Sequence, residues 1–112
     1  MGNVERISEI AMQVITFSGL AKSNYLQALK AYRTKNLEAY NNFLIQGDQS
    51  FTQAHHAHLS VLQEEMNSGE SQITMLMAHA EDQLMAAETI KTLIIEIVEI
   101  LEERMNGYGS TL

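Results

Sequence analysis

The chain has 112 residues and no cysteine, so it has the size of one small domain and excludes disulfide bridges, thiolate metal sites and cysteine nucleophiles. Its formal net charge of −7 argues against a nucleic-acid partner, because phosphate backbones bind basic surfaces. No basic-then-apolar leader opens the chain, and no apolar run approaches the length of a membrane span. We therefore expect a cytoplasmic protein without direct membrane insertion.

The first part of the chain has the periodicity of a long helix. Proline is absent, which removes the strongest helix breaker. Apolar or small residues recur at alternating spacings of three and four from Val4 to Tyr32, as one seam of a packed bundle requires. Residues 33–36 interrupt this pattern, and Asn36 has the side chain of a helix N-cap. The spacing predicts a first helix over about residues 3–33.

A second helix is predicted over about residues 36–67. Its apolar residues, from Leu37 to Met66, lie along one broad face. Gly47 and the following aspartate interrupt the pattern, and we expect them to loosen the helix locally. Gly69 then favours a left-handed C-terminal cap.

The third helix is predicted over about residues 71–105, with Ser71 as its cap. The tail, residues 106–112, has two glycines and no periodicity, so we expect it to be frayed. Short connections between long helices place neighbours antiparallel. The sequence therefore predicts an all-α fold, an antiparallel up-down-up three-helix bundle, with residues 1–112 forming a single domain.

The third helix carries more apolar surface than a monomeric bundle buries. One apolar stripe runs from Ile73 to Met105, and a second stripe contains Met75, His79, Asp82, Ala86 and Leu93. A helix in a three-helix monomer buries about one face. The second stripe therefore predicts self-association, for which closed cyclic symmetry is the economical arrangement.

Among the four histidines, His79 has the strongest placement for chemistry. It lies in the second stripe, one helical turn before Asp82, so the two side chains share a face. Neutral imidazole is a competent nucleophile at cytoplasmic pH, and a phosphohistidine is labile enough to serve in a relay. The alternative is a partly buried structural histidine that is hydrogen-bonded to Asp82. A second alternative is a metal site formed with His55 and His58.

The segment 79–85, His-Ala-Glu-Asp-Gln-Leu-Met, closely resembles a phosphorylation-site motif. It is the motif of the lactose/cellobiose family of IIA components of the bacterial phosphoenolpyruvate-dependent sugar phosphotransferase system, where it commonly reads His-Ala-Gln-Asp-His-Leu-Met. Four further segments are similar to the family's pattern and follow in the same order: residues 19–23, 28–31, 53–55 and 63–70. The resemblance extends from about Val4 to Met105.

The resemblance implies a role for each matching residue. His79 matches the histidine that accepts a phosphoryl group from the phosphocarrier HPr and passes it to the IIB component. The membrane component IIC then delivers the sugar, expected to be a β-linked disaccharide such as cellobiose or lactose. Asp82 matches an aspartate at the threefold axis of a homotrimer, where it can bind a divalent cation, expected to be one Mg²⁺ per trimer. The rival functions are a non-enzymatic helical scaffold or adaptor and a metal-binding helical bundle.

Two residues depart from the family motif. Glu81 stands in place of glutamine, and it should raise the transfer barrier unless its carboxylate points into solvent. Gln83 stands in place of histidine and cannot titrate near neutrality. His55 occupies a position where the family often has histidine, and we expect it to pack against the third helix. The methionines around His79 suit either a docking surface or the core; they are Met75, Met77 and Met85.

Overall fold

The computed structural model describes residues 2–108. Within these residues it contains three long helices, α1 (Gly2–Arg33), α2 (Leu37–Ser68) and α3 (Met75–Glu103), followed by a π-helical turn, η1 (Arg104–Tyr108), and no strand. The predicted all-helical, three-helix fold is confirmed for this part of the chain. None of these helices combines the length and the apolarity that a membrane span requires.

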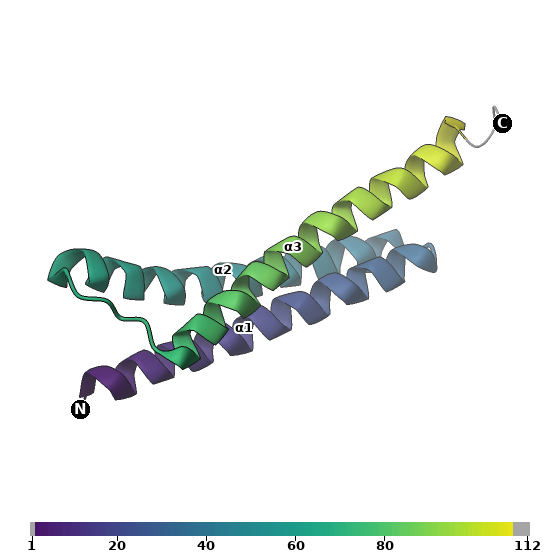
Figure 1. The fold of residues 1–112 in the computed structure, drawn as a ribbon. Helices are drawn as coiled ribbons and strands as arrows, with labels where there is room; N and C mark the ends of the chain where they lie inside the picture. Colours follow the sequence, from purple (N-terminus) through teal and green to yellow (C-terminus); the bar gives the residue numbers. More distant parts are fainter. Residues whose placement is uncertain (1, 109–112) are drawn as a thin grey trace.

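The three helices form an elongated molecule of 64 × 22 × 19 Å. In Figure 1, α2 returns alongside α1, and α3 then runs in the same general direction as α1. Towards its C-terminal end α3 leans away from the line of the other two helices. Long helices of this kind obtain most of their stability from tertiary packing rather than from intrinsic propensity.

Two of the caps that the sequence predicts are present, Asn36 at the start of α2 and Gly69 at its end. The side chain of Asn36 accepts a hydrogen bond from the backbone N–H of Ala39 at 3.1 Å. Gly69 has a φ of 72°, and its N–H donates to the carbonyl oxygen of Glu65. An L side chain disfavours this left-handed conformation, which explains the glycine at this position.

The predicted cap of the third helix, Ser71, is wrong, and the helix begins three residues later. Thr74 is the N-cap, and its Oγ1 accepts a hydrogen bond from the backbone N–H of Met77 at 3.0 Å. Gln72 is buried, and its backbone N–H donates to Oε2 of Glu65 at 3.0 Å. This bond to α2 holds the segment before Thr74 in a non-helical conformation.

The C-terminal boundary also differs from the prediction. The α-helix ends at Glu103, two residues before the predicted end at 105, and residues 104–108 form the π-helical turn. Residues 109–112 of the predicted tail lie outside the described residues.

Gly47 does not loosen α2, which is continuous through this position. A Cβ built on Gly47 would lie 2.5 Å from Cε1 of Tyr25, so the glycine allows the ring to pack directly on the α2 backbone. The Tyr25 hydroxyl donates to Oδ1 of Asp48 at 2.7 Å, and Nζ of Lys91 lies 2.7 Å from the same oxygen. Gly47 and Asp48 therefore contribute contacts between α2 and the other two helices, and they do not interrupt α2.

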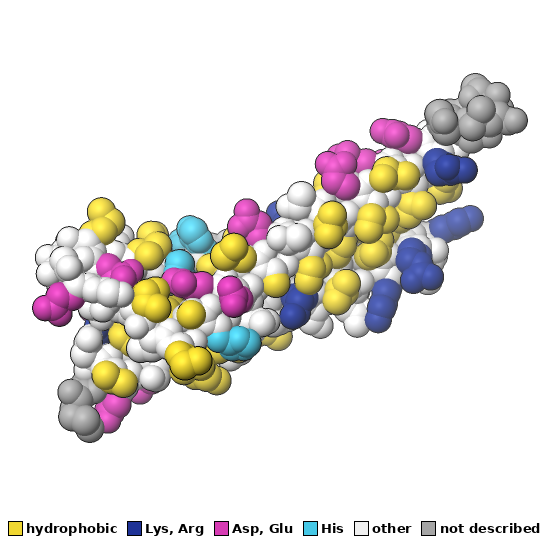
Figure 2. Space-filling view, in the orientation of Figure 1, with side chains coloured by type: hydrophobic (Ala, Val, Ile, Leu, Met, Phe, Trp, Pro, Cys, Tyr) yellow, Lys and Arg dark blue, Asp and Glu magenta, His cyan; other side chains and the backbone are white. Residues whose placement is uncertain are grey.

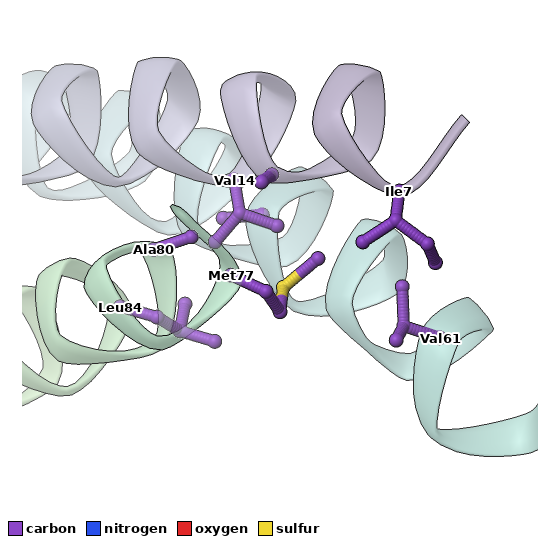
Figure 3. Packing of buried hydrophobic residues seen from close by; sticks show 8 residues of the cluster. Ile7, Val14, Val61, Met77, Ala80 and Leu84 are labelled. Atoms are coloured by element: carbon purple, nitrogen blue, oxygen red, sulfur yellow. The ribbon is translucent and has the colours of Figure 1, made fainter. Parts of the chain in front are cut away.

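The core follows the predicted seam of α1 closely, and Figure 3 shows its N-terminal part. Met77 of α3 lies among Ile7 and Val14 of α1 and Val61 of α2. A second buried cluster, around Tyr25, continues along the bundle, and its other members are Ala21, Ala87, Ile94 and Val98.

The predicted apolar face of the second helix is wrong in part. The buried residues of α2 are Gly47, Ala54 and Val61, which repeat every seven positions. Two of them are small, so the helices approach closely there. The larger residues at the ends of the predicted face, Leu37 and Met66, are exposed.

Candidate functional site

The start of α3 fixes the direction of the His79 side chain. Thr74 caps the helix, and Met77 and Ala80 are both fully buried in the core. His79 lies between these two buried residues, about 100° around the helix from Ala80. The packing of its neighbours therefore turns the imidazole of His79 away from the core, and the side chain is exposed.

His79 presents a free imidazole to solvent. Within residues 2–108 its ring has no side-chain hydrogen-bond partner, and Asp82, one turn later, is also exposed. The alternative of a partly buried structural histidine bonded to Asp82 is therefore wrong. An accessible ring nitrogen with an unshared lone pair can act as a nucleophile.

Glu81 does not direct its charge at His79. Its Oε2 lies 2.7 Å from Nε2 of His58 on α2, and the two side chains are 28% and 15% exposed. Residues two apart on a helix point in nearly opposite directions, about 200° apart. The sequence left two directions open for the Glu81 carboxylate, into solvent or towards His79. The structure shows a third direction, because His58 of α2 binds the carboxylate.

Gln83 lies on the other flank of α3 and contacts α1. Its Oε1 accepts a hydrogen bond from Nζ of Lys22 at 3.5 Å, in a partly buried setting. Residues four apart on a helix are neighbours on one face. Lys22 therefore brings a cation to the side of α3 that carries His79.

The other histidines do not join His79 in a metal site. No group of three or more histidine, aspartate or glutamate side chains is placed to hold a metal ion in the described part of the chain. His58 is engaged by Glu81, and His55 is exposed and stacks on Phe51 with ring centroids 6.3 Å apart. The predicted alternative of an imidazole-carboxylate site from one chain is therefore wrong for these residues.

His55 lines a cavity of about 280 Å³ beside α3, and its expected packing on the third helix is limited to this edge. The other residues that line it are Tyr25, Phe51, Glu88 and Lys91. Burial, reinforced by the hydrogen bond to Asp48 and its negative charge, raises the pKa of Tyr25. The phenol is therefore neutral, and it serves as a donor in the packing of α1 on α2.

The three methionines near His79 divide between surface and core. Met75 is 92% exposed, and Met85 is also exposed, whereas Met77 is fully buried. Exposed thioether side chains on both sides of the histidine are flexible apolar contacts of the kind that adaptable binding surfaces use.

Comparison with known proteins assigns this arrangement to a family. The family model described as "PTS system, Lactose/Cellobiose specific IIA subunit" matches residues 9–102. The chain belongs to this family. The lichenan-specific phosphotransferase enzyme IIA component of Bacillus subtilis is 29% identical, over 96% of this chain and 98% of the relative.

Other relatives of this IIA chain are named for different sugars. The oligo-beta-mannoside-specific EIIA component of Bacillus subtilis is 28% identical over 86% of this chain and 87% of its own length. The N,N'-diacetylchitobiose-specific EIIA component of Escherichia coli is 26% identical over 88% of this chain and 85% of its own length. The crystal structure of the cellobiose-specific enzyme IIA from Bacillus anthracis superposes with a TM-score of 0.81 at 26% identity, covering 88% and 91% of the two chains.

Sequence reasoning proposed His79 and Asp82 as site residues, but it did not pair Glu81 with His58 or Gln83 with Lys22. His58 and Lys22 each bond to a residue that departs from the family motif, Glu81 and Gln83 respectively. Both bonds join side chains far apart in sequence, so their pairing depends on the register between helices. The only signal for Lys22 in the sequence is its place inside a family-like segment, residues 19–23.

Proposed function

We propose that this IIA chain is a phosphoryl carrier in the cytoplasm, which accepts phosphate from phospho-HPr on His79 and donates it to its cognate IIB component. The observation that carries the proposal is the exposed, unbonded imidazole of His79 at the position of the family's phosphorylation motif. Relatives named for lichenan, oligo-beta-mannoside and lactose support a β-linked disaccharide, such as cellobiose or lactose, as the transported sugar.

The proposed transfer requires in-line approach and little covalent assistance. The lone pair of a ring nitrogen of His79, which we assign as Nε2, attacks phosphorus while the P–N bond to the donor histidine breaks. The electron pair of that bond returns to the donor imidazole, so no net proton is taken up. In the second transfer the thiolate of a cysteine of IIB attacks the phosphorus, the N–P bond to His79 breaks, and the electron pair of that bond returns to the imidazole of His79. Exposure of His79 suits successive, transient docking of two partners.

We further propose that three copies assemble through an exposed seam of α3. The seam consists of the second stripe of α3 extended by Ile100, at spacings of three, four and seven: Met75, His79, Asp82, Ala86, Leu93 and Ile100. Its large apolar members, Met75, Leu93 and Ile100, are 92%, 55% and 54% exposed in the single chain. Figure 2 shows apolar side chains gathered along the visible face of α3. Burying such a stripe against symmetric copies removes apolar area from water.

Asp82 is an exposed charged residue of this seam, and the described residues of one chain place no group of three metal-ligating side chains around it. In a threefold assembly about the seam, three Asp82 carboxylates converge. Oxygen ligands with room for water suit Mg²⁺. We therefore propose Asp82 as the residue that would hold one Mg²⁺ at the axis, where the ion offsets the repulsion between carboxylates.

Phosphorylation by phosphoenolpyruvate, Enzyme I and HPr tests the proposed function. Wild-type protein should take up one acid-labile phosphoryl group per chain, and His79→Ala should take up none while keeping its helicity. His56→Ala is the matched control, because His56 is an exposed histidine of α2 and its loss should leave uptake unchanged. A chain that takes no label, as a helical scaffold would, contradicts the proposal.

A further inference from the structure

Lys22 occupies a position that its hydrogen bond to Gln83 alone does not explain. Its Nζ reaches from α1 to Oε1 of Gln83 at 3.5 Å, which is a long contact between a charged donor and a neutral acceptor. A lysine beside a carboxylate would form a stronger bond. The ammonium therefore retains donor capacity at this point of the surface.

The register of α3 places this ammonium beside His79. Gln83 is one helical turn after His79, about 40° around the axis, and side chains at this spacing have Cβ atoms about 5–6 Å apart. Glu81, in contrast, is on the far flank, where His58 engages it. Cation and anion are thus separated across α3, with the cation on the side of the acceptor histidine.

A phosphoryl group on His79 needs such a cation. Phosphorylation adds about two negative charges near neutrality to a chain whose net charge is already −7, with Asp82 one turn away. Two of the other basic residues are engaged by carboxylates at distant points, Arg6 by Glu64 and Lys91 by Asp48. Among the hydrogen bonds of residues 2–108, the bond from Lys22 is the one that brings a lysine or arginine side chain to this turn of α3.

We propose that Lys22 is a phosphoryl-contacting residue whose ammonium donates a hydrogen bond to a phosphoryl oxygen on His79, and that Gln83 positions it in the unphosphorylated chain. This inference rests on His79 as the acceptor. During transfer, the N–P bond to the donor breaks as the bond to His79 forms. The ammonium keeps its three protons throughout and stabilises the charge on the equatorial oxygens.

The test uses the full chain with two phosphoryl donors, phospho-HPr and potassium phosphoramidate. Phosphoramidate is a small molecule, so its reaction with His79 needs no protein docking. Lys22→Met should slow uptake at His79 about tenfold with either donor, the effect of losing one charge-assisted hydrogen bond at a partly solvated site. Lys22→Arg keeps the charge and should stay within about twofold of wild type. Lys30→Met is the matched control, since Lys30 is an exposed lysine further along α1.

A double-mutant comparison of Gln83 with Lys22 distinguishes a role in phosphoryl transfer from a purely structural role of Lys22. Gln83→Met should slow uptake in the wild-type background, because the ammonium loses its anchor. The same substitution should have no further effect in the Lys22→Met background. Helicity and thermal unfolding of each variant, measured alongside, separate this coupling from a loss of fold.

Three outcomes overturn the proposal. They are equal rates for Lys22→Met and Lys30→Met, a loss of rate with phospho-HPr that phosphoramidate does not reproduce, and a Lys22→Arg variant as slow as Lys22→Met. The second outcome would make Lys22 a docking residue for HPr. If wild type takes label from phosphoramidate and not from phospho-HPr, the proposed relay fails while the role of Lys22 is still measured.

Discussion

Nε2 of His58 and Oε2 of Glu81 lie 2.7 Å apart and join α2 to α3 two residues beyond the exposed His79. Both side chains are less than one-third exposed, so the pair is screened less than a surface ion pair. The family motif commonly has an uncharged glutamine at position 81. In this chain the carboxylate of Glu81 has a partner on the neighbouring helix, and its charge faces away from His79, the proposed phosphoryl acceptor.

The first prediction is a measurable coupling between His58 and Glu81. His58→Ala leaves a partly buried carboxylate without its partner and should lower the free energy of unfolding by about 1–2 kcal/mol. In the Glu81→Gln background the same substitution should cost less, because no charge is stranded. Urea unfolding of the four proteins at one protein concentration gives the coupling. The more exposed Arg6–Glu64 pair is the control and should show a smaller coupling. Additive effects at His58 and Glu81 would contradict the prediction.

The second prediction concerns two glycines with opposite surroundings. Gly47→Ala places a Cβ 2.5 Å from the Tyr25 ring, which its hydrogen bond to Asp48 holds in place, and should destabilise the fold by about 1–3 kcal/mol. Gly19→Ala meets no atom within 4 Å and should stabilise α1 by up to about 1 kcal/mol through helix propensity. Thermal unfolding of both variants is the measurement. A stabilising Gly47→Ala would show that the ring can move aside.

These two glycines also mark how far the sequence predicts the fold. Periodicity identified three helices, because long amphipathic patterns without proline have few alternatives. Gly47 was expected to loosen α2, since a sequence does not reveal that Tyr25 of another helix packs against it. Likewise Ser71 has the side chain of a cap, but the buried Gln72 and its bond to Glu65 move the helix start to Thr74.

The part of the candidate site that lies within one helix could be predicted from the sequence. His79 and Asp82 share a motif, and their spacing alone places them on one face. The partners Lys22 and His58 come from other helices, and their pairing requires the register of α3 against α1 and α2. That register depends on how the buried residues of α3, Met77 among them, pack against the other two helices, and a pattern within one helix does not reveal it.

The third prediction is a loss of stability at alkaline pH that Tyr25 causes. Its pKa is raised in the folded chain, first by burial and then by Asp48. Stability from this group is complete below the unfolded pKa of about 10 and is lost as the pH rises from there towards the folded pKa, because the unfolded chain releases the proton first. Melting curves across this range should fall more steeply for wild type than for Tyr25→Phe. Parallel curves would contradict the prediction.

The fourth prediction tests the exposed seam of α3 as an assembly surface. Ile100→Lys should abolish the proposed trimer at micromolar concentration, because each copy loses the burial of an isoleucine, worth about 1.5–3 kcal/mol, and gains a like charge. Ile45→Lys is the matched control, since Ile45 on α2 is 55% exposed and Ile100 is 54% exposed. Sedimentation equilibrium measures the assembly state. A wild-type monomer at that concentration, or equal effects of the two substitutions, would remove the seam from the assembly.

The last prediction concerns Asp82, the charged residue within that seam. If three copies meet there, their carboxylates repel each other more strongly than in water, because the surrounding protein has a lower dielectric constant. Asp82→Asn removes this repulsion and should raise the melting temperature of the assembly in the presence of a chelator. Magnesium should then raise the melting temperature of wild type and leave that of Asp82→Asn unchanged, since the amide is a weaker ligand for a hard cation. Glu88→Gln serves as the control, because Glu88 is an exposed carboxylate of the same helix that lies outside the seam. A wild-type melting temperature that responds to neither chelator nor magnesium, over a range of protein concentrations, would exclude the ion. His79 would remain the proposed acceptor in either case, because that proposal rests on its imidazole and the family motif and does not require a bound ion.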